Sequence, residues 1–411
     1  MTLSIPIKNC IGCESNLISE VGTLGYLPNC NFFPKTKDEA INLQRYNLNV
    51  VVCNNCKLAQ VGTHLPVESI FNNDYPYFSS ASSSWLSHSK DLANYLSKKL
   101  SIEKNDLVVE LGSNDGYFLK NFSKQIKTLG IEPSKAPAKK ASEIGIETIN
   151  DFFSENLATQ ILSSHGKAKI IASMNMLAHS PDLRGILNGV KTLLKSDGVF
   201  ISEIQYSIEM FKSGKFDTIY HEHFSYFSLT SILNIFETVG LNIFDVEFVD
   251  THGGSMRIFA SPNNSKNKIS ENISRTLNYE KKIGVNNLDF YSNIFSKANT
   301  IKENFKSLID KHKYIIGYGA PTKGSVFCNF CELSPSDILH TTDVSELKQG
   351  NFMPGTGIPI LPPTANAYMD SDAVVVFPWN ISEEIKKIFS KWFPNKKNFL
   401  YVAVPELKKI L

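Results

Sequence analysis

The sequence lacks a long apolar run and a large excess of charge of either sign. No apolar stretch approaches the roughly 18 residues that a membrane-spanning helix requires, so we expect no membrane span. The 42 lysine and arginine residues nearly balance the 40 aspartate and glutamate residues, which argues against strong attraction to nucleic acid or anionic lipid. The amino terminus has no basic segment followed by an apolar run, as a secretion signal would have. We therefore expect a cytoplasmic protein with no nucleic-acid or membrane partner.

The sequence also lacks internal repeats and low-complexity tracts, which argues against a solenoid or a disordered protein. A chain of 411 residues with 42% hydrophobic residues is long enough for two or three domains, each with its own core. A polar stretch at residues 261–268 indicates one domain boundary, because helical sequence follows it up to about Lys311.

Cysteines are few but unevenly placed. Two C-x-x-C pairs lie in short polar turns, C-I-G-C and C-N-N-C, of the kind that wraps a tetrahedral metal ion. Four thiolates suit zinc and leave no open coordination position, so we predict a structural site with the ligands Cys10, Cys13, Cys53 and Cys56.

Other interpretations of the cysteines stay open, because the segment between the two pairs is longer than in a compact zinc ribbon. Reduced structural thiols are one alternative, and disulfides are another that fits poorly with a cytoplasmic location. Cys30 is a further candidate ligand. Cys328 and Cys331 lie far from the other cysteines, and we expect them to pack in a helix.

Residues 73–89 are rich in serine and aromatic side chains. This composition is typical of a lid or of a crossing between domains, and an amphipathic helix follows near residues 86–100. Tyr75, Tyr77 and Trp85 would line a site in the first case and pack onto a neighbouring domain in the second. Both interpretations stay open.

The central segment has the clearest pattern. Residues 106–119 read D-L-V-V-E-L-G-S-N-D-G-Y-F-L, which predicts a buried strand, a glycine turn and the start of a helix. The next strand ends at Glu132, about twenty residues after Gly112, as in Rossmann-type sites where an acidic residue accepts hydrogen bonds from ribose hydroxyls. Strands and helices alternate through residues 170–204, so we predict a parallel sheet with helices on both faces.

The glycine turn is unusual because it carries carboxylates. Glu110, Gly112, Asp115 and Gly116 give the pattern acid-x-Gly-x-x-Asp-Gly instead of G-x-G-x-x-G. Such a turn lacks a plain pyrophosphate nest and suits a cationic ligand better than a diphosphate. S-adenosylmethionine, with a sulfonium and an ammonium group, therefore fits better than NAD.

Residues 217–227 read D-T-I-Y-H-E-H-F-S-Y-F, which concentrates histidines, a glutamate and tyrosines in one short stretch. A zinc site, a proton-transfer site and an aromatic stretch with structural histidines are the three interpretations. The zinc interpretation needs further ligands nearby, and the local sequence offers none that is compelling.

Two later segments suggest substrate contacts. In the turn H-G-G-S-M-R at residues 252–257, backbone N–H groups and Arg257 would lie near a sugar or phosphate, unless the turn only closes a hairpin. Residues 314–325, Y-I-I-G-Y-G-A-P-T-K-G-S, predict a second strand-turn-helix whose helix start would receive a diphosphate, unless this domain is structural and binds no ligand. Asp343 follows another predicted strand, and a buried strand is predicted to end at Asn380.

Several of these motifs occur together and in a fixed order. The two cysteine pairs are followed by four motifs: E-L-G-S-N-D-G-Y-F-L, N-M-L-A-H-S-P-D-L, F-D-T-I-Y-H-E-H-F-S-Y-F-S and T-H-G-G-S-M-R-I-F-A. Two further motifs come later in the chain, G-Y-G-A-P-T-K-G-S and K-Q-G-N-F-M-P-G-T. Together they closely resemble the three-domain S-adenosylmethionine-dependent sugar C-methyltransferases over essentially the whole chain. Two positions depart from the family pattern: Gly112 replaces a small residue such as alanine, and Gln205 stands where proline is common.

The resemblance implies an α/β fold with three domains. The expected zinc-binding domain spans residues 1–75, a class I methyltransferase domain with a Rossmann-like sheet spans 76–270, and a Rossmann-like nucleotide-sugar-binding domain spans 271–411. The resemblance also implies a nucleotide-linked sugar as substrate, and we expect a monomer or small homo-oligomer.

The resemblance also implies roles for individual residues. Transfer of a methyl group to carbon requires a carbanion, and a histidine near neutral pKa is suited to removing a proton next to a carbonyl. The implied base is His223, with Glu222 orienting it, Tyr220 bonded to the keto oxygen, and His221 and Tyr77 in support. The positions assigned to the methyl donor are Glu110, Gly112, Asn114, Asp115, Gly116, Glu132, Asp151, Asn175 and His179. Those assigned to the substrate are Tyr75, His252, Arg257, Lys323, Gly324, Ser325, Asp343, Lys348 and Asn380.

Three other functions stay open from the sequence. An O- or N-methyltransferase would use the same donor site. A pyridine-nucleotide oxidoreductase would bind its cofactor at the turn after Gly317. A zinc-dependent nucleic-acid-binding protein is disfavoured by the balanced charge.

Overall fold

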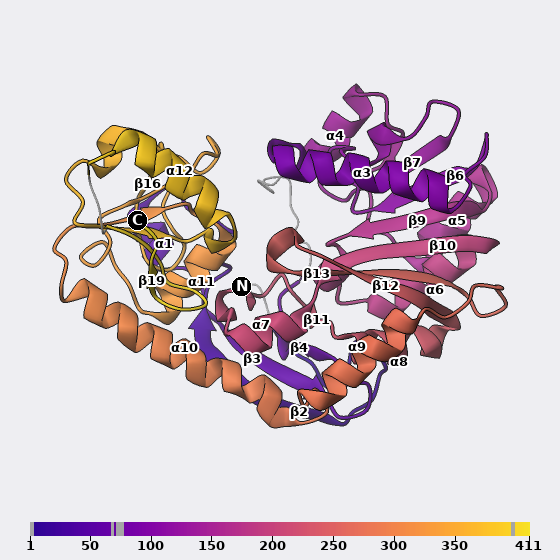
Figure 1. Ribbon diagram of the computed structural model, residues 1–411, viewed down its shortest axis with the longest axis horizontal. Helices are drawn as coiled ribbons and strands as arrows, with labels where there is room; N and C mark the ends of the chain where they lie inside the picture. Colours follow the sequence, from indigo (N-terminus) through magenta and orange to yellow (C-terminus); the bar gives the residue numbers. More distant parts are fainter. Residues whose placement is uncertain (1–3, 67–69, 71–77, 396–398) are drawn as a thin grey trace.

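The computed structural model describes residues 4–66, 70, 78–395 and 399–411, which form the three-part crescent of Figure 1. Tyr75 and Tyr77 lie outside the described residues. Among the described residues, no helix combines the length and the apolar character needed to cross a membrane.

The first part is a four-stranded antiparallel sheet in the order β11-β4-β3-β2. Its strands are β2 (Ile18–Leu27), β3 (Tyr46–Cys53), β4 (Ala59–Val61) and β11 (Ser225–Tyr226). A short helix, α1 (Lys37–Ile41), and a two-stranded sheet of β1 (Ile5–Pro6) and β5 (Thr63–His64) complete this part. Because β11 comes from the middle of the chain, the amino-terminal sheet includes a strand from the segment that follows the predicted base.

The central part is a seven-stranded sheet in the order β12-β13-β10-β9-β6-β7-β8. Its strands are β6 (Leu107–Leu111), β7 (Lys127–Ile131), β8 (Thr148–Ile149), β9 (Ala168–Met174), β10 (Leu194–Gln205), β12 (Leu241–Val249) and β13 (Ser255–Pro262). The five strands from β8 to β10 are parallel, as predicted. The sheet is not wholly parallel, however, because β13 returns through a hairpin and is antiparallel to both β12 and β10.

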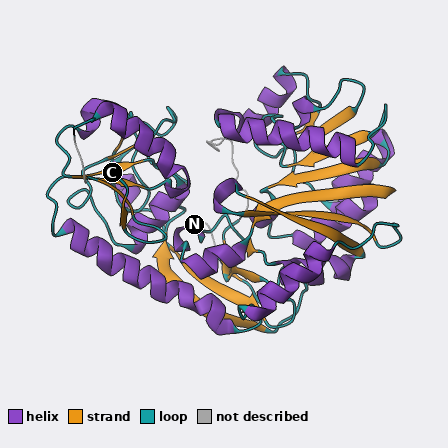
Figure 2. Cartoon of the chain, viewed as in Figure 1, coloured by secondary structure: helices purple, strands orange, loops and turns teal. Residues whose placement is uncertain are grey.

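Both faces of the central sheet are covered by helices (Figure 2). Along β6, Leu107 and Val109 pack with residues of α5 (Glu155–His165) and α6 (Leu183–Leu193), whereas Val108 packs with residues of α3 (Ser83–Lys99). This alternation follows from the two-residue period of a strand, and burial of both faces explains the unbroken apolar run L-V-V. The remaining helices of this part are α4 (Lys135–Glu143), α7 (Ser207–Ser213) and α8 (Leu229–Val239).

The helix predicted after the glycine turn is absent. Between β6 and β7 the described chain forms only a 3-10 turn, η2 (Leu119–Asn121). The Asn121 side chain donates to the carbonyl oxygens of Tyr117 (2.9 Å) and Phe118 (3.0 Å), so it occupies acceptors that a longer helix would need. The prediction of a helix at 86–100 is confirmed with a shifted start, because the Ser82 hydroxyl accepts from the Trp85 N–H and caps α3.

The third part is a six-stranded sheet in the order β16-β15-β14-β17-β18-β19, parallel except for β19. The strands are β14 (Ile315–Tyr318), β15 (Thr341–Thr342), β16 (Ile360–Leu361), β17 (Ala373–Val376), β18 (Leu400–Val402) and β19 (Lys408–Lys409). The helices are α9 (Glu271–Lys282), α10 (Leu288–Ile309), α11 (Thr322–Phe330) and α12 (Ser382–Trp392). Helix α10 packs against β2 and α7 on its way to this sheet (Figure 1).

The strand predicted to end at Asn380 is shorter than expected. Strand β17 ends at Val376, and residues Trp379–Ile381 form the 3-10 helix η7. Pro378 lacks a backbone N–H and its φ is −77°, so it cannot continue the ladder.

A buried carboxylate joins the central and third parts. Glu280 on α9 is fully buried and accepts four hydrogen bonds, from the Tyr206 hydroxyl (2.9 Å), the Leu229 N–H (2.7 Å), and the N–H (2.8 Å) and hydroxyl (2.5 Å) of Thr230. Its negative charge also faces the positive end of the α8 dipole. Glu280 therefore fixes α9 to the start of α8.

Replacing Glu280 with Gln should lower the free energy of unfolding by about 2 kcal/mol, because an amide nitrogen would face buried donors. Urea unfolding monitored by circular dichroism would measure the difference. The exposed pair Arg275 and Glu271 on the same helix offers a control, since Glu271→Gln should change stability little. Equal stability of Glu280→Gln and the unaltered protein would contradict this role.

Candidate active site

The turn after β6 has the backbone conformation that the sequence pattern requires. Gly112 has φ +67° and Gly116 has φ +77°, and both values favour glycine. A Cβ at Gly112 would lie 2.8 Å from the Cγ atom of Met176, so the turn also approaches the chain after β9 closely. Asn114, at φ +47°, directs its side-chain oxygen to the Ser79 N–H at 2.8 Å.

Glu132 lies beside this turn, as predicted. Its carboxylate is 5% exposed and accepts from the backbone N–H groups of Asn114 (2.9 Å) and Ser134 (2.8 Å). Burial raises the pKa of Glu132, although these hydrogen bonds oppose the rise. The two bonds hold the carboxylate still and leave lone pairs for the hydroxyl groups of a ribose.

Three acidic side chains, Glu110, Asp115 and Glu132, gather around the turn and are buried. Glu110 is fully buried, and burial raises its pKa well above the usual value, with the charges of Glu132 and Asp115 adding to the rise and a hydrogen bond from Tyr117 opposing it. Asp115 accepts from the Ser80 N–H at 3.2 Å, but its other oxygen is buried with no partner among the described residues. A cationic ligand would relieve this burial of acid groups. The donor set therefore fits the ammonium and sulfonium groups of S-adenosylmethionine.

Other residues assigned to the methyl donor follow neighbouring strands. Asp151 comes after β8 and is exposed, and Asn175 comes after β9 with φ +56° and donates its N–H to the Glu203 carbonyl at 2.7 Å. The carboxyl ends of parallel strands meet at one edge of a sheet, where ligands of such folds bind. The structure thus brings Gly112, Glu132, Asp151 and Asn175 to the same edge.

His223 is held in a defined orientation. Its Nδ1 lies 3.0 Å from the carbonyl oxygen of Thr218, so Nδ1 carries the proton and donates. Its Nε2 lies 2.6 Å from the Tyr220 hydroxyl, which donates to it. The partly buried imidazole therefore presents a basic Nε2 atom. The ring of His179, which follows β9, lies edge-on with its centroid 4.8 Å away, and desolvation lowers its pKa to about 4.

The two residues between Tyr220 and His223 point elsewhere. His221 is buried and packs edge-on against Tyr46 at 6.0 Å, and burial lowers its pKa to about 4. Burial raises the pKa of Glu222 to about 7, while a hydrogen bond from Asn31 and the charge of Lys348 oppose the rise. The Glu222 carboxylate therefore lies near Asn31 of the first part and Lys348 of the third part.

The four predicted zinc ligands converge. The sulfur atoms of Cys10, Cys13, Cys53 and Cys56 all lie within 4.8 Å of one another, with two pairs at 3.5 Å. The edges of a zinc tetrathiolate measure about 3.8 Å, given zinc–sulfur bonds of about 2.3 Å, so the cluster fits a tetrahedral zinc ion. In the described part of the chain this is the one group of three or more histidine, cysteine or acidic side chains suited to a metal.

The zinc interpretation of residues 217–227 therefore gains no support. Cys30 is not a member of the cysteine cluster, since its sulfur lies 3.4 Å from the Pro28 carbonyl oxygen. Cys328 and Cys331 are buried at α11, as expected for packing residues.

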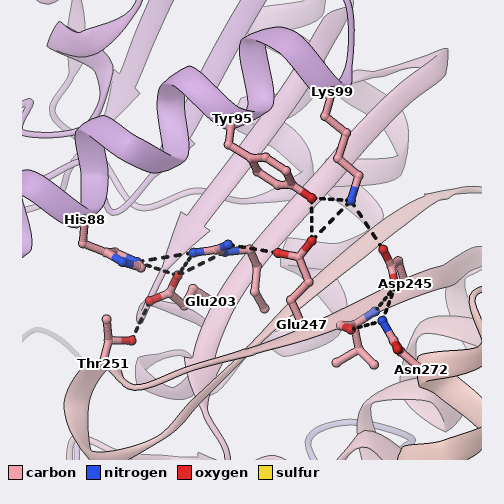
Figure 3. A network of polar contacts seen from close by, with 10 residues as sticks. His88, Tyr95, Lys99, Glu203, Asp245, Glu247, Thr251 and Asn272 are labelled. Carbon is pink, nitrogen blue, oxygen red and sulfur yellow. Dashed lines mark hydrogen bonds and ion pairs between the residues drawn. The ribbon is translucent and has the colours of Figure 1, made fainter.

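Arg257 belongs to an ion-pair network that Figure 3 shows at close range. Its guanidinium contacts Glu203 at 3.1 Å and Glu247 at 3.0 Å. Glu203 also accepts from the Thr251 hydroxyl (2.8 Å) and contacts His88 Nε2 (2.9 Å). The network continues from Glu247 to Tyr95, Lys99, Asp245 and Asn272. This geometry favours a role for Arg257 in holding α3 against β10, β12 and β13. The backbone of His252 lies in the adjoining turn η5 (Thr251–Gly253).

The substrate residues assigned to the third part gather where β14, β15 and β17 end. Lys323 donates to Asn380 at 3.0 Å and lies over the Trp379 ring at 4.2 Å. Asp343 accepts from the Ala320 N–H at 2.7 Å, and Lys348 lies 4.0 Å from the same carboxylate. Gly324 and Ser325 are buried in the first turn of α11.

Two contacts at this edge were not predicted. Trp379 Nε1 donates to Asp217 at 2.7 Å, and Lys215 donates to the Gly253 carbonyl at 2.9 Å. Asp217 is the first residue of the histidine-rich stretch 217–227, but no sequence periodicity links it to a tryptophan 162 positions away.

Cys13→Ser should lower the zinc content well below one ion per chain and reduce thermal stability, because a hydroxyl is a poor substitute for a thiolate. Elemental analysis of the purified protein and a thermal melt would measure both. Cys30→Ala is the matched control and should retain zinc. A full complement of zinc in Cys13→Ser would contradict the assignment.

The Glu203 network should stabilise the fold in a pH-dependent way. Burial alone would raise the pKa of Glu203, but the hydrogen bond and charge of His88 and the charge of Arg257 outweigh it, so the pKa is lowered from 4.5. This contribution is present above about pH 4.5 and is lost as the pH falls through the lowered value. Glu203→Gln should therefore cost about 3 kcal/mol at neutral pH and progressively less in acid, as measured by urea unfolding. A pH-independent difference would contradict it.

Comparison with known proteins agrees with this architecture. Three family descriptions match consecutive parts of the chain: "Putative zinc binding domain" at residues 10–71, "Methyltransferase domain" at 84–246 and "C-methyltransferase C-terminal domain" at 250–405. The chain is 32% identical over 410 residues to the C-methyltransferase NovU of Streptomyces niveus, with 98% of this chain and 97% of that protein covered.

Solved methyltransferase structures resemble part of the chain. A S-adenosylmethionine-dependent methyltransferase from Anabaena variabilis is 15% identical, with 42% of this chain and 84% of that chain covered and a TM-score of 0.34. Magnesium protoporphyrin IX methyltransferase from Synechocystis is 14% identical, with 43% and 78% covered and a TM-score of 0.32. On the sequence identity over nearly its full length and the three consecutive domain matches, the chain belongs to the family of three-domain S-adenosylmethionine-dependent C-methyltransferases.

Proposed function

We propose that this C-methyltransferase acts on a keto sugar linked to a nucleotide, with His223 as the base. The observation that carries the proposal is the orientation of the imidazole: Nδ1 donates to the Thr218 carbonyl, so the lone pair is on Nε2. That lone pair accepts from the Tyr220 hydroxyl here and would take the substrate proton once the hydroxyl turns to the keto oxygen. A carbonyl makes the hydrogens on its neighbouring carbons acidic enough for such a base.

The electrons of the reaction balance without a further reagent. Nε2 of His223 takes the proton, and the electron pair of the broken carbon–hydrogen bond forms an enolate. S-adenosylmethionine, held by the turn at Gly112 and by Glu132, would supply the methyl group to the enolate carbon, and the electrons of the broken sulfur–methyl bond would stay on sulfur. Holding the two reactants in line replaces an encounter in solution with an intramolecular step, an advantage of roughly 7–11 kcal/mol.

Tyr220 is the hydroxyl donor beside the base. Its oxygen lies 2.6 Å from His223 Nε2, and the two rings stack obliquely at 3.9 Å. We assign this O–H to the keto oxygen, where it would stabilise negative charge as the enolate forms. His179 stays neutral beside the base because desolvation lowers its pKa, so it adds no positive charge that would weaken the basicity of His223.

The third domain is the proposed binding site of the nucleotide. Lys323 at the start of α11 supplies one positive charge, and the helix N-terminus supplies backbone N–H groups, so a diphosphate is the chemistry that suits this edge. We assign Asp343, at the end of the neighbouring strand β15, to the hydroxyl groups of the ribose. We place the reaction in the cytoplasm, where the free cysteines of the described residues would stay reduced.

His223→Asn should reduce methyl transfer by 100-fold or more, within the roughly 10²–10⁴-fold that a general base contributes. The assay would incubate the protein with labelled S-adenosylmethionine and a panel of 4-keto sugar nucleotides, and NMR of the product would show whether the methyl group resides on carbon, oxygen or nitrogen. His165→Asn, at the carboxyl end of α5, is the control and should keep full activity. Unchanged turnover in His223→Asn would contradict the assignment of His223 as the base. A methyl group on oxygen or nitrogen of the product would contradict transfer to carbon.

A further inference from the structure

The carbonyl group that orients His223 belongs to a very short element, the 3-10 helix η4 (Phe216–Thr218). Three residues cannot hold their own conformation, because a single turn leaves most of its backbone groups without intrahelical partners. The position of the Thr218 carbonyl must therefore be set by what η4 packs against. Those contacts come largely from the third domain.

Phe216 anchors η4 in the core of that domain. The side chain is fully buried, and its ring lies 4.9 Å from the ring of Phe330 and 6.3 Å from that of Phe327, both on α11. Phe327 in turn packs with Phe377 after β17. Apolar packing of this kind fixes depth but leaves a short helix free to rotate, since dispersion contacts are not directional.

Asp217 makes a directional contact that can fix the rotation of η4. Its carboxylate is 1% exposed, and one oxygen accepts from Trp379 Nε1 at 2.7 Å. The other oxygen has no hydrogen-bond partner among the described residues. Burial raises the pKa of Asp217 to about 6, whereas the charges of Lys323 and Lys215 and the bond from Trp379 oppose the rise.

Trp379 itself contacts two cations. Lys323 lies over its ring at 4.2 Å and Lys215 at 5.3 Å, each within the range of a cation–π contact. Lys215 also donates to the carbonyl of Gly253, and a Cβ at Gly253 would lie 2.9 Å from the Trp379 ring. The indole therefore fits closely against both η4 and the turn after β12.

We propose that Asp217 and Trp379 are positioning residues for the base, so that the third domain sets the geometry of proton removal. Trp379 holds Asp217, and Asp217 fixes the rotation of η4. The neighbouring Thr218 carbonyl then keeps the proton on Nδ1 of His223 and the lone pair on Nε2. The inference rests on the proposed role of His223 as base.

Trp379→Phe is the sharpest test, because it removes the N–H donor and keeps an aromatic ring near the two lysines. We expect kcat to fall about 10- to 100-fold, since a misplacement of about 1 Å can cost 10²-fold, while KM for S-adenosylmethionine stays unchanged. Asp217→Leu should have the same effect, and the double variant should be no worse than either single one. Trp392→Phe is the matched control: Trp392 lies in the same domain, packs on Tyr368 and Phe389, and should leave kcat unaltered.

Nitrogen-15 NMR of the His223 ring provides a readout that needs no substrate. The unaltered protein should show a protonated Nδ1, and Trp379→Phe should show a mixture of the two neutral tautomers. A higher KM for the sugar nucleotide with unchanged kcat would assign Trp379 to substrate binding and overturn the proposal. Unchanged kcat and an unchanged ring signal would also overturn it.

The NMR arm separates the two claims. If His223→Asn keeps its turnover while Trp379→Phe still shifts the ring signal, the base assignment fails and the positioning contact survives. If His223→Asn is inactive while Trp379→Phe leaves the ring signal and kcat unchanged, the base assignment survives and the positioning contact fails.

Discussion

The bond between His223 Nδ1 and the Thr218 carbonyl is the contact on which the site depends, because it decides which ring nitrogen can accept a proton. The short segment that carries both residues is not held by the methyltransferase domain alone. On one side, Phe216 packs in the core of the third domain. On the other, β11 begins at Ser225 and pairs with β4 of the amino-terminal sheet. The proposed proton removal would therefore take place on a segment of the central domain that is held by the two neighbouring domains.

The cysteine cluster that suits zinc also supports this segment. Strand β4 follows directly after the second cysteine pair, and the Gln60 side chain accepts from the Ile11 N–H in the first pair at 3.0 Å. Gln60 is also the register partner of Ser225 in β11. The two cysteine pairs and the segment after the proposed base thus meet at one residue. A closed tetrathiolate suits such a structural task because no coordination position is left for substrate.

The sequence allowed the local features of the protein to be predicted and left the long-range ones hidden. The glycine turn at Gly112, the acid at Glu132 and the cysteine pairs are short patterns whose physics lies within a few residues, and the structure brings their members together. The pairing of β11 with β4 involves a two-residue strand, too short for any periodicity. Arg257 pairs with two carboxylates, and Asp217 accepts from Trp379. Both contacts form only when distant segments fold together, which a single sequence does not reveal. The shortened β17 could have been predicted, because Pro378 stands inside the assumed strand.

Proton removal can be observed apart from methyl transfer. In heavy water, without S-adenosylmethionine, the enzyme should incorporate deuterium at the sugar carbon next to the carbonyl, and His223→Asn should not. Because this exchange needs a base and no methyl donor, it isolates the central claim. Mass spectrometry of the recovered sugar nucleotide would count the deuterium. Equal incorporation by the unaltered enzyme and by His223→Asn would contradict the assignment of His223 as the base.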